Sequence, residues 1–361
     1  MSKQHHPGNE RIKRDYFAFL KEAKGHSEST VDAAASAIAS YESFTEWADF
    51  RSYSPELAAQ FKKSVLERAH PVTAEPLSRS TAYTTFGFVK RFIQWLSMQP
   101  GYRSKIKYSD SEYLNSSSSD ARIATARRVL IGPEMSEILA IVRAMPVATD
   151  VDKRNRAVIA FTALTGARDA AIRTFKLRHY DEERRCIFQD AREVATKLAK
   201  SFTTFIFPVD KTLYEIFVDW VKFLRNVRDW GDDDPLFPAT KSHQEADFCF
   251  GTGRLERRHW ANARPIRDIF RRACKKSGLQ YFNPHSFRST LTRYGMSICQ
   301  TPEEFKAWSQ NFGHEHVMTT LSSYGTVSER RQGEILEKLG ESKSDPKLEA
   351  AIRTLIDAAR S

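Results

Sequence analysis

Residues 163–172 read ALTGARDAAI and join one helix to the next. The apolar run AVIAFTAL at 157–164 predicts a buried helix, and Thr165 with Gly166 is a typical helix end. Arg168 then begins the following helix, where unpaired backbone amides and a guanidinium together suit a phosphate. Taken alone, an arginine in this position is more often a surface charge.

Helical patterns surround this junction, with one interruption. Residues 132–145 and 151–168 both predict helices. Residues 185–209 instead alternate apolar and polar side chains, include β-branched residues and are broken near Lys197 to Lys200. This pattern predicts a small antiparallel sheet, and helical periodicity returns after it. The predicted fold class is therefore mainly α with a small antiparallel β-sheet (α+β).

Residues 10–100 predict a separate all-helical unit. Apolar side chains recur at helical spacing after a cap at Ser29 or Thr30, and a second helix begins at Ser54 and Pro55. A third helix ends before Pro100 and Gly101, and its apolar face consists of Phe86, Phe88, Val89, Phe92, Ile93, Trp95 and Leu96. We predict a helical N-terminal domain over residues 1–105.

The polar, serine-rich residues 106–128 predict a linker. A second domain is then predicted over residues 129–340. Residues 341–361 predict a C-terminal amphipathic helix, with Asp345 as its cap and Pro346 in its first turn. Such a helix packs on its own domain or docks on a neighbouring molecule.

The composition is that of a globular protein. The 361 residues are 41% hydrophobic and 12% aromatic, which is enough to fill two cores. The longest apolar run is too short to cross a bilayer, and the first 16 residues contain no apolar signal segment. We therefore expect a soluble, cytoplasmic protein. The four cysteines lack the paired spacing of a disulfide framework or a zinc site: Cys186, Cys249, Cys274 and Cys299.

Positive charge is concentrated after residue 120. The net charge is +11, but residues 1–120 contribute only +2, from 16 Lys and Arg against 14 Asp and Glu. Residues 254–276 hold nine basic and two acidic side chains. This density favours a polyanionic partner. The alternative is a solvated helix face.

The segment NPHSFRSTLTRYG at 283–295 places His285 and Arg288 three residues apart. If Pro284 lies at a helix start, the imidazole and the guanidinium share one face and can reach the same group. Phe287 then points into the core. The alternative is a capped helix with two incidental polar residues.

The stretch NFGHEHVMTTLSSYGT at 311–326 contains Gly313, His314 and, ten residues after the histidine, Tyr324. An ordinary tyrosine hydroxyl has a pKa near 10, so only about one in a thousand is ionised at neutral pH. A nucleophilic Tyr324 therefore needs activation by side chains from elsewhere in the chain.

Together these segments present, in order, an arginine, a lysine in a predicted hairpin, His-x-x-Arg, Gly-His and a tyrosine. This order resembles the tyrosine recombinase (phage integrase) family, and the resemblance extends from the N-terminal helical unit to Tyr324. By this resemblance the catalytic positions are Arg168, Lys197, His285, Arg288, His314 and Tyr324, with Lys200 as the alternative lysine.

The resemblance implies a reaction that the residues suit. Arg168 and Arg288 clamp the charged phosphorane-like state through bidentate hydrogen bonds and favour the phenolate of Tyr324. His285 accepts the tyrosine proton, Lys197 protonates the leaving 5' oxygen and His314 donates to a phosphate oxygen. The covalent phosphotyrosine conserves the bond energy of the phosphodiester. We therefore expect no metal, no other cofactor and no ATP.

The sequence departs from the family pattern at one position. Family members often carry a glutamate three residues after the first arginine, but Ala171 stands there and Asp169 directly follows Arg168. Asp169 is the candidate to take over the supporting role of that glutamate. His316 is the alternative to His314, and we interpret it as a surface residue.

The family grips DNA between a helical core-binding domain and a catalytic domain. We therefore expect double-stranded DNA with inverted half-sites as the partner, a homotetramer on that DNA, accessory proteins in some systems, and a C-terminal helix that docks in trans. Most contacts should be to phosphates. The candidate DNA-contacting residues are Arg79, Lys90, Arg91, Arg257, Arg258, Arg264, Arg267, Arg271 and Arg272.

The leading functional hypothesis is a site-specific recombinase or integrase of a mobile element. One alternative is a type IB topoisomerase-like relaxase, because the same residues cleave and reseal one strand. The other is a DNA-binding regulator that has the fold without catalysis, although all the main residue types of the active site are present.

Overall fold

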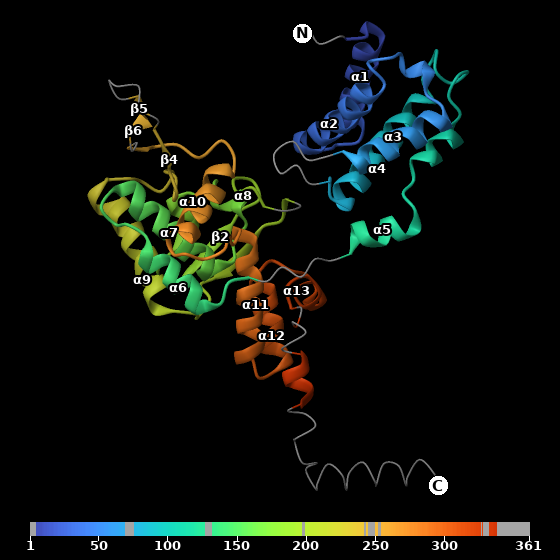
Figure 1. Cartoon of the computed structure of the whole chain (residues 1–361). Coiled ribbons are helices and arrows are strands. Elements are labelled where there is room, and N and C mark those ends of the chain that lie inside the picture. The colour runs from blue at the N-terminus through green and yellow to red at the C-terminus, as the bar shows by residue number, and fades with distance from the viewer. Residues whose placement is uncertain are drawn as a thin grey trace, which may run out of the picture. The chain divides into compact units, whose positions relative to one another are not determined.

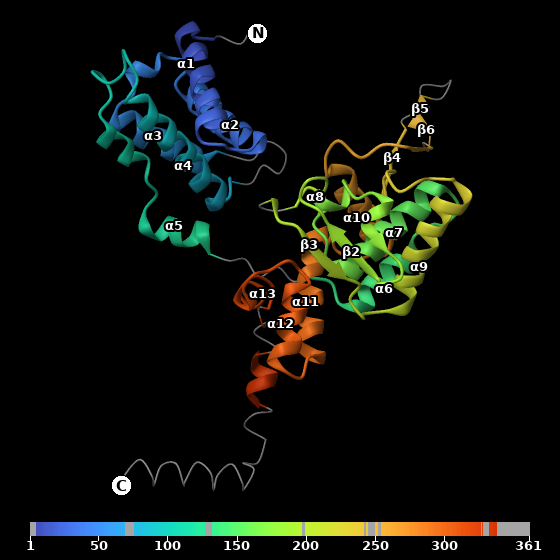
Figure 2. The same ribbon diagram turned by 180° about the vertical axis from the view of Figure 1, so that it is seen from behind.

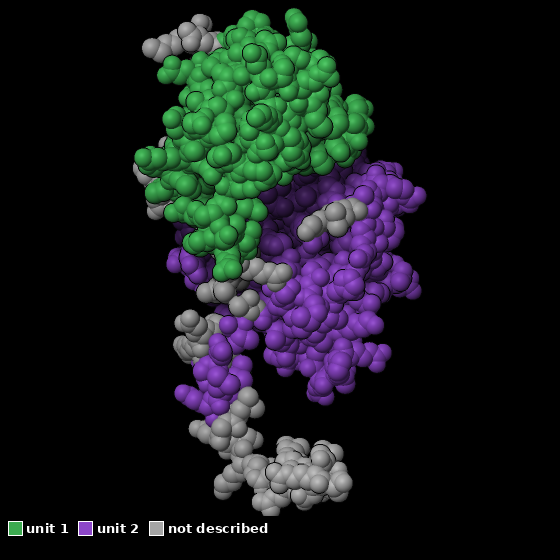
Figure 3. Space-filling model, turned by 90° about the vertical axis from the view of Figure 1, so that its right-hand side faces the viewer, with its two compact units in different colours: residues 1–128 green, residues 129–361 purple. Residues whose placement is uncertain are grey.

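The computed structural model describes residues 5–68, 76–126, 132–196, 199–241, 243–244, 250–251, 254–325, 327 and 332–337. The chain forms two compact units, residues 1–128 and residues 129–361, drawn in different colours in Figure 3. Each unit has its own hydrophobic core.

The first unit is helical (Figure 1). Ser54 caps α3 through a hydrogen bond from Leu57 N to its Oγ, with Pro55 as the first helical residue, as predicted. The cap of α2 is Ser27, slightly before the predicted Ser29 or Thr30. The elements are α1 (Pro7–Ala18), η1 (Phe19–Ala23), α2 (Glu28–Phe44), η2 (Phe50–Ser52), α3 (Pro55–Glu67), α4 (Arg79–Leu96), η3 (Tyr108–Leu114) and α5 (Ser118–Thr125).

The predicted apolar face of α4 forms much of this unit's core. Six of its seven predicted residues are buried, whereas Phe88 is half-buried against the same cluster. Residues 106–128, for which the sequence predicts a linker, contain η3 and α5. Leu114 and Ile106 are buried in the core, so the start of this segment packs as part of the first unit.

The second unit consists of helices packed around α7, together with small antiparallel sheets (Figures 1 and 2). Its elements are α6 (Met135–Ala144), α7 (Asp150–Thr165), α8 (Asp169–Ile172), η4 (Leu177–His179), β1 (Tyr180–Asp181), β2 (Cys186–Gln189), β3 (Phe202–Phe205), α9 (Lys211–Lys222), η6 (Phe223–Val227), β4 (Ala239–Thr240), β5 (His243–Gln244), β6 (Phe250–Gly251), β7 (Leu255–Glu256), α10 (Arg264–Lys276), η7 (Pro284–Ser286), α11 (Phe287–Ile298), α12 (Pro302–Gln310) and α13 (Val317–Tyr324).

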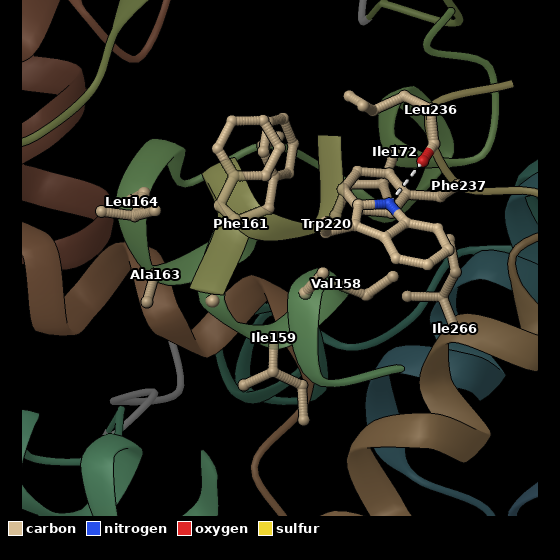
Figure 4. Close-up of a cluster of buried hydrophobic side chains, with 14 of the residues drawn as sticks. Val158, Ile159, Phe161, Ala163, Leu164, Ile172, Trp220, Leu236, Phe237 and Ile266 are labelled. Carbon is tan, nitrogen blue, oxygen red and sulfur yellow. Dashed lines mark hydrogen bonds between the residues drawn. The ribbon is translucent and has the colours of Figure 1, made fainter. Parts of the chain in front are cut away.

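Helix α7 is the centre of this core. Every residue from Ala157 to Thr165 is buried, as expected for a helix that is covered on all sides. Phe161 contacts the aromatic rings of Phe175, Phe217 and Phe237. Figure 4 shows Phe161 and Phe237 among the buried side chains of this core, and the hydrogen bond that Trp220 Nε1 donates to the Leu236 carbonyl.

The main sheet has the order β1-β2-β3 and is antiparallel throughout. Cys186 pairs with Phe205 and Gln189 with Phe202, which places the loop between β2 and β3 near the predicted break. The predicted class, mainly α with a small antiparallel sheet, is confirmed. Two short strand pairs, β4 with β7 and β5 with β6, were not predicted.

Helices α11, α12 and α13 lie together in both ribbon views (Figures 1 and 2). The predicted amphipathic helix at residues 341–361 lies outside the described residues. Within the described part of the chain, no helix has the length and apolar character needed to cross a membrane.

Candidate active site

Arg168 follows the C-terminal end of α7. Gly166 ends that helix with φ +59°, and Gly166 N donates to the Thr162 carbonyl at 2.8 Å. A Cβ at Gly166 would lie 2.8 Å from Cε1 of Phe312, so glycine permits both the turn and a close approach of the C-terminal helices. The half-buried Arg168 is the N-cap residue of the short helix α8.

Arg288 lies on α11 and is only 2% exposed. Its Nη2 donates to the Phe312 carbonyl at 2.7 Å, and its guanidinium lies 4.8 Å from the centroid of the Phe312 ring. Its Nε and Nη1 are buried without a hydrogen-bond partner among the described residues. Arg168 and Arg288 line the same small pocket.

Two like charges therefore lie near each other in a partly desolvated site. Burial, and then the charge of Arg168, lower the pKa of Arg288 to about 9, while Tyr324 opposes this effect. At neutral pH the guanidinium remains protonated. A bound anion would offset the cost of burying this charge, so the pocket suits a phosphate.

Tyr324, the last residue of α13, is 8% exposed and contacts three of the predicted residues. Its hydroxyl lies 3.3 Å from Nε2 of His285, a hydrogen-bonding distance. Its ring stacks parallel to that of His314, with centroids 5.6 Å apart, and lies 5.4 Å from the Arg288 guanidinium carbon.

The predicted local structure around His285 is nearly correct. Asn283 caps a 3-10 turn, η7, that contains the exposed His285, and α11 continues from it with Arg288 in its first turn. Phe287 is fully buried, as predicted. The turn and helix together direct the imidazole and the guanidinium toward Tyr324.

His314 is buried and is held by a residue that the sequence did not indicate. Its Nδ1 lies 2.7 Å from Oγ1 of Thr320, which in turn lies 2.6 Å from Oγ of Ser309. Thr320 is fully buried on α13, so this hydroxyl joins α12, α13 and the histidine. His316, the alternative histidine, is exposed at the N-cap of α13.

The segment before His314 is attached to the sheet. The Asn311 side chain accepts from Phe205 N at 2.7 Å and donates to the Phe205 carbonyl at 2.8 Å, which satisfies the backbone groups of this residue at the edge of β3 as another strand would. Gly313 has φ +74°, and a Cβ there would lie 2.7 Å from the Phe202 ring. The sequence contained no periodic signal for Asn311 or Phe312.

Lys200 is the lysine candidate that lies within the described residues. Lys197, the predicted catalytic lysine, lies outside the described residues. Lys200, the alternative, forms an exposed ion pair with Glu315 at 3.0 Å and lowers the pKa of that carboxyl group. Glu315 directly follows His314, so this pair connects the β2–β3 loop to the histidine segment.

Asp169 contacts helix α10 and, within the described residues, is hydrogen-bonded to none of the predicted catalytic side chains. Its Oδ2 accepts from Arg267 Nε on α10 at 2.7 Å, and its Oδ1 accepts from Ala170 N at 2.9 Å. Ala171, at the position where family members often carry glutamate, is buried. Asp169 therefore connects the start of α8 to the basic helix α10.

Most candidate DNA-contacting residues have a carboxylate partner. Exposed pairs of this kind contribute little, so a phosphate can replace the carboxylate. Ion pairs are formed by Arg79, Lys90, Arg257, Arg258, Arg264, Arg267 and Arg271, whereas Arg91 and Arg272 form none with the described residues. Their contact with DNA stays a prediction.

The second unit matches a known family. The family described as the phage integrase family matches residues 129–331, which contain Arg168 and Tyr324. The chain belongs to the phage integrase family. A comparison with curated protein sequences finds no match.

Solved structures of phage integrase relatives share this fold. The lambda integrase dimer bound to a COC' core site has a TM-score of 0.60 at 14% identity, covering 89% of this chain and 96% of that chain. XerH bound to palindromic difH substrate in a post-cleavage complex has a TM-score of 0.56 at 14% identity, with coverages of 90% and 84%. The Tn1549 transposon integrase in complex with transposon right end DNA has a TM-score of 0.55 at 13% identity, with coverages of 91% and 99%.

Proposed function

We propose that this phage integrase family member is a site-specific DNA recombinase that cleaves and rejoins strands through a 3'-phosphotyrosyl intermediate. The observation that carries the proposal is the position of Tyr324. Its hydroxyl lies 3.3 Å from His285 Nε2, and its ring lies beside His314 and the buried Arg288. A nucleophile, a proton acceptor and an anion-binding group thus meet at one point.

In the cleavage step, the Tyr324 oxygen forms a bond to phosphorus and its proton passes to His285. Arg168 and Arg288 bind the non-bridging oxygens and stabilise the extra charge of the transition state. Nε and Nη1 of Arg288 have no hydrogen bond to the described residues, which leaves them able to donate to those oxygens. His314, oriented by Thr320, supplies a further donor.

The bond from phosphorus to the 5' oxygen then breaks, and the leaving oxygen takes a proton from Lys197. Rejoining reverses these steps with a 5' hydroxyl from another strand, so the phosphodiester energy is conserved. The reaction uses no metal or ATP in this proposal.

The proposed substrate is double-stranded DNA with paired inverted half-sites, bound in a homotetramer and found with the nucleoid in the cytoplasm. Support comes from the structural neighbours, one of which is a dimer bound to a core site and another of which is bound to a palindromic substrate. We further propose that the predicted C-terminal helix docks in trans and that accessory proteins can join the assembly on DNA.

The nucleophile is tested by covalent trapping. A library of randomised duplexes carrying a single nick is incubated with the protein, and DNA attached to it is recovered after denaturation. We expect wild type to trap DNA, Tyr324→Phe to trap none, and Tyr294→Phe to match wild type, because the Tyr294 hydroxyl donates to the Pro208 carbonyl and is not among the proposed catalytic groups. Equal trapping by Tyr324→Phe would refute the assignment, and failure of wild type would favour a silent regulator.

The lysine is tested by changing the leaving group. A 5'-bridging phosphorothiolate needs no general acid, because a thiolate leaves without a proton at neutral pH. Lys197→Ala should cleave ordinary DNA slowly and the phosphorothiolate at the wild-type rate. If Lys200→Ala shows this rescue and Lys197→Ala does not, the assignment moves to Lys200.

A further inference from the structure

A second basic pocket lies in the catalytic unit outside the candidate active site. It is formed by the start of α7, strand β4 and the N-terminal part of α10 with the segment before it. We call it the basic pocket, and its polar and aromatic lining residues are Arg154, Thr240, Arg258, Trp260, Asn262 and Arg272. None of the described residues that line it is acidic.

Arg154 is the buried charge of this pocket, with 3% of its surface exposed. Its Nη1 donates to the Pro238 carbonyl at 2.7 Å and to Thr240 Oγ1 at 2.8 Å. Its Nε and Nη2 both donate to Asn155 Oδ1, and its guanidinium carbon lies 4.9 Å from the Trp260 ring. All these partners are neutral.

Buried charges are normally paired with an opposite charge. Arg154 forms no ion pair with any residue of the described ranges. Burial, and then the charge of Arg272, lower the pKa of Arg154 to about 9. The excess of positive charge at this site follows from its lining, which contains Arg154, Arg258 and Arg272 and, among the described residues, no carboxylate.

Two further guanidinium groups line the same pocket. Arg272 is exposed on α10 and forms no ion pair within the described chain, whereas Arg258 shares an exposed pair with Glu256 at 2.7 Å. Guanidinium groups bind phosphate oxygens in a bidentate manner. The side chains of Arg258 and Arg272 can therefore turn toward an anion at little cost in free energy.

The pocket has a volume of about 260 Å³. Sites for drug-sized ligands span about 300–1,000 Å³, so this volume suits a single phosphoryl group better than a whole nucleotide. Arg154 lies in the first turns of α7 and Arg168 follows its C-terminal end, so about 16 Å of helix, from Arg154 to Thr165, lies between them. No residue lines both the basic pocket and the pocket of Arg168 and Arg288.

We propose that the basic pocket binds a phosphoryl group that is distinct from the scissile phosphate. Two sources share this chemistry, a backbone phosphate of bound DNA and a free phosphate ion. Binding of a DNA backbone phosphate rests on the proposed function, whereas binding of a free phosphate ion does not. In both cases the oxyanion contacts Arg258 and Arg272 and offsets the buried charge of Arg154.

Tryptophan emission measures occupancy directly, because Trp260 lines the pocket and contacts Arg154. Inorganic phosphate is titrated at constant ionic strength, with chloride as the control anion. For a free ligand we expect a saturable emission change in wild type that Trp260→Phe lacks. Arg272→Gln should weaken the binding about tenfold or more, as expected when a charge-assisted hydrogen bond is lost. Arg225→Gln removes the same charge from an exposed pair with Asp232 and should match wild type.

For a DNA source, inorganic phosphate produces no saturable change, but duplex DNA alters the Trp260 emission. Arg272→Gln then reduces the slope of log affinity against log salt by about one, and Arg225→Gln does not. A reduced slope without a Trp260 signal would place the Arg272 contact outside the pocket and overturn the proposal. No signal with either ligand would also overturn it. If the pocket binds phosphate but the protein traps no DNA, the proposed recombinase function is contradicted and the proposal for the basic pocket stands.

Discussion

Gly166→Ala is the most informative single substitution, because it tests how α7 meets the C-terminal helices. Gly166 has φ +59°, and an added Cβ would lie 2.8 Å from the Phe312 ring and 3.1 Å from Cδ1 of Leu291. The substitution therefore combines backbone strain with steric overlap. Phe312 also provides the carbonyl that accepts from Arg288, so the overlap reaches the candidate active site.

The two contributions can be separated by a matched control. Gly278 has φ +72°, but no atom lies within 4 Å of its Cβ position. A left-handed conformation costs a non-glycine residue about 1–2 kcal/mol, so Gly278→Ala should cost that amount alone. Overpacking costs about 1–3 kcal/mol more, so Gly166→Ala should lose about 2–5 kcal/mol.

Thermal and urea unfolding of the full chain measure these differences. For a unit of 150–250 residues, each kcal/mol lowers Tm by about 2–4 °C, so Gly166→Ala should unfold several degrees below Gly278→Ala. Because Arg288 is displaced with Phe312, covalent trapping should also decrease in Gly166→Ala and stay near wild type in Gly278→Ala. Equal stability of the two variants would refute the close contact between Gly166 and Phe312.

Two other substitutions test the packing of polar groups. Thr320→Val removes the hydroxyl that joins His314 to Ser309, and losing a buried partner costs about 1–3 kcal/mol. Covalent trapping should therefore slow in Thr320→Val. Thr319 is exposed on the same helix, so Thr319→Val is the control and should match wild type. A wild-type rate in Thr320→Val would contradict the role of the hydroxyl. Burial lowers the pKa of His179 below its usual 6.5 despite a carboxylate partner. The unfolded chain then binds this proton more readily, so the free energy of unfolding should decrease as pH falls below about 6.5. His179→Gln should flatten this part of the urea-unfolding profile against pH, and an unchanged slope would show that other groups cause it.

The sequence predicted elements best where a periodic pattern met a clear end signal. The apolar face of α4, the buried run of α7 and the Ser54–Pro55 start of α3 are local features, so they can be recognised without knowing their neighbours. Residues 106–128 lack such a pattern, yet Leu114 is buried because a neighbouring surface exists only in the folded unit.

The candidate site divides in the same way. The chemical types and the order of Arg168, His285, Arg288, His314 and Tyr324 could be read from the chain, because the chemistry needs those groups. Phe312, Thr320 and Asn311 could not, since an aromatic, a hydroxyl and an amide have many possible uses. Their roles arise from contacts between helix α11, α12, α13 and strand β3.

By itself the sequence determined the helical character of the chain, the basic surplus after residue 120 and the residue types that we propose attack and bind a phosphodiester. These are properties of composition, spacing and local backbone preference. Only the tertiary structure decided that Tyr324 meets His285 and that Arg288 is buried against Phe312. It also created the basic pocket around Arg154, whose lining residues are separated by up to 118 positions. Burial and proximity are properties of the packed core, and no single segment contains them.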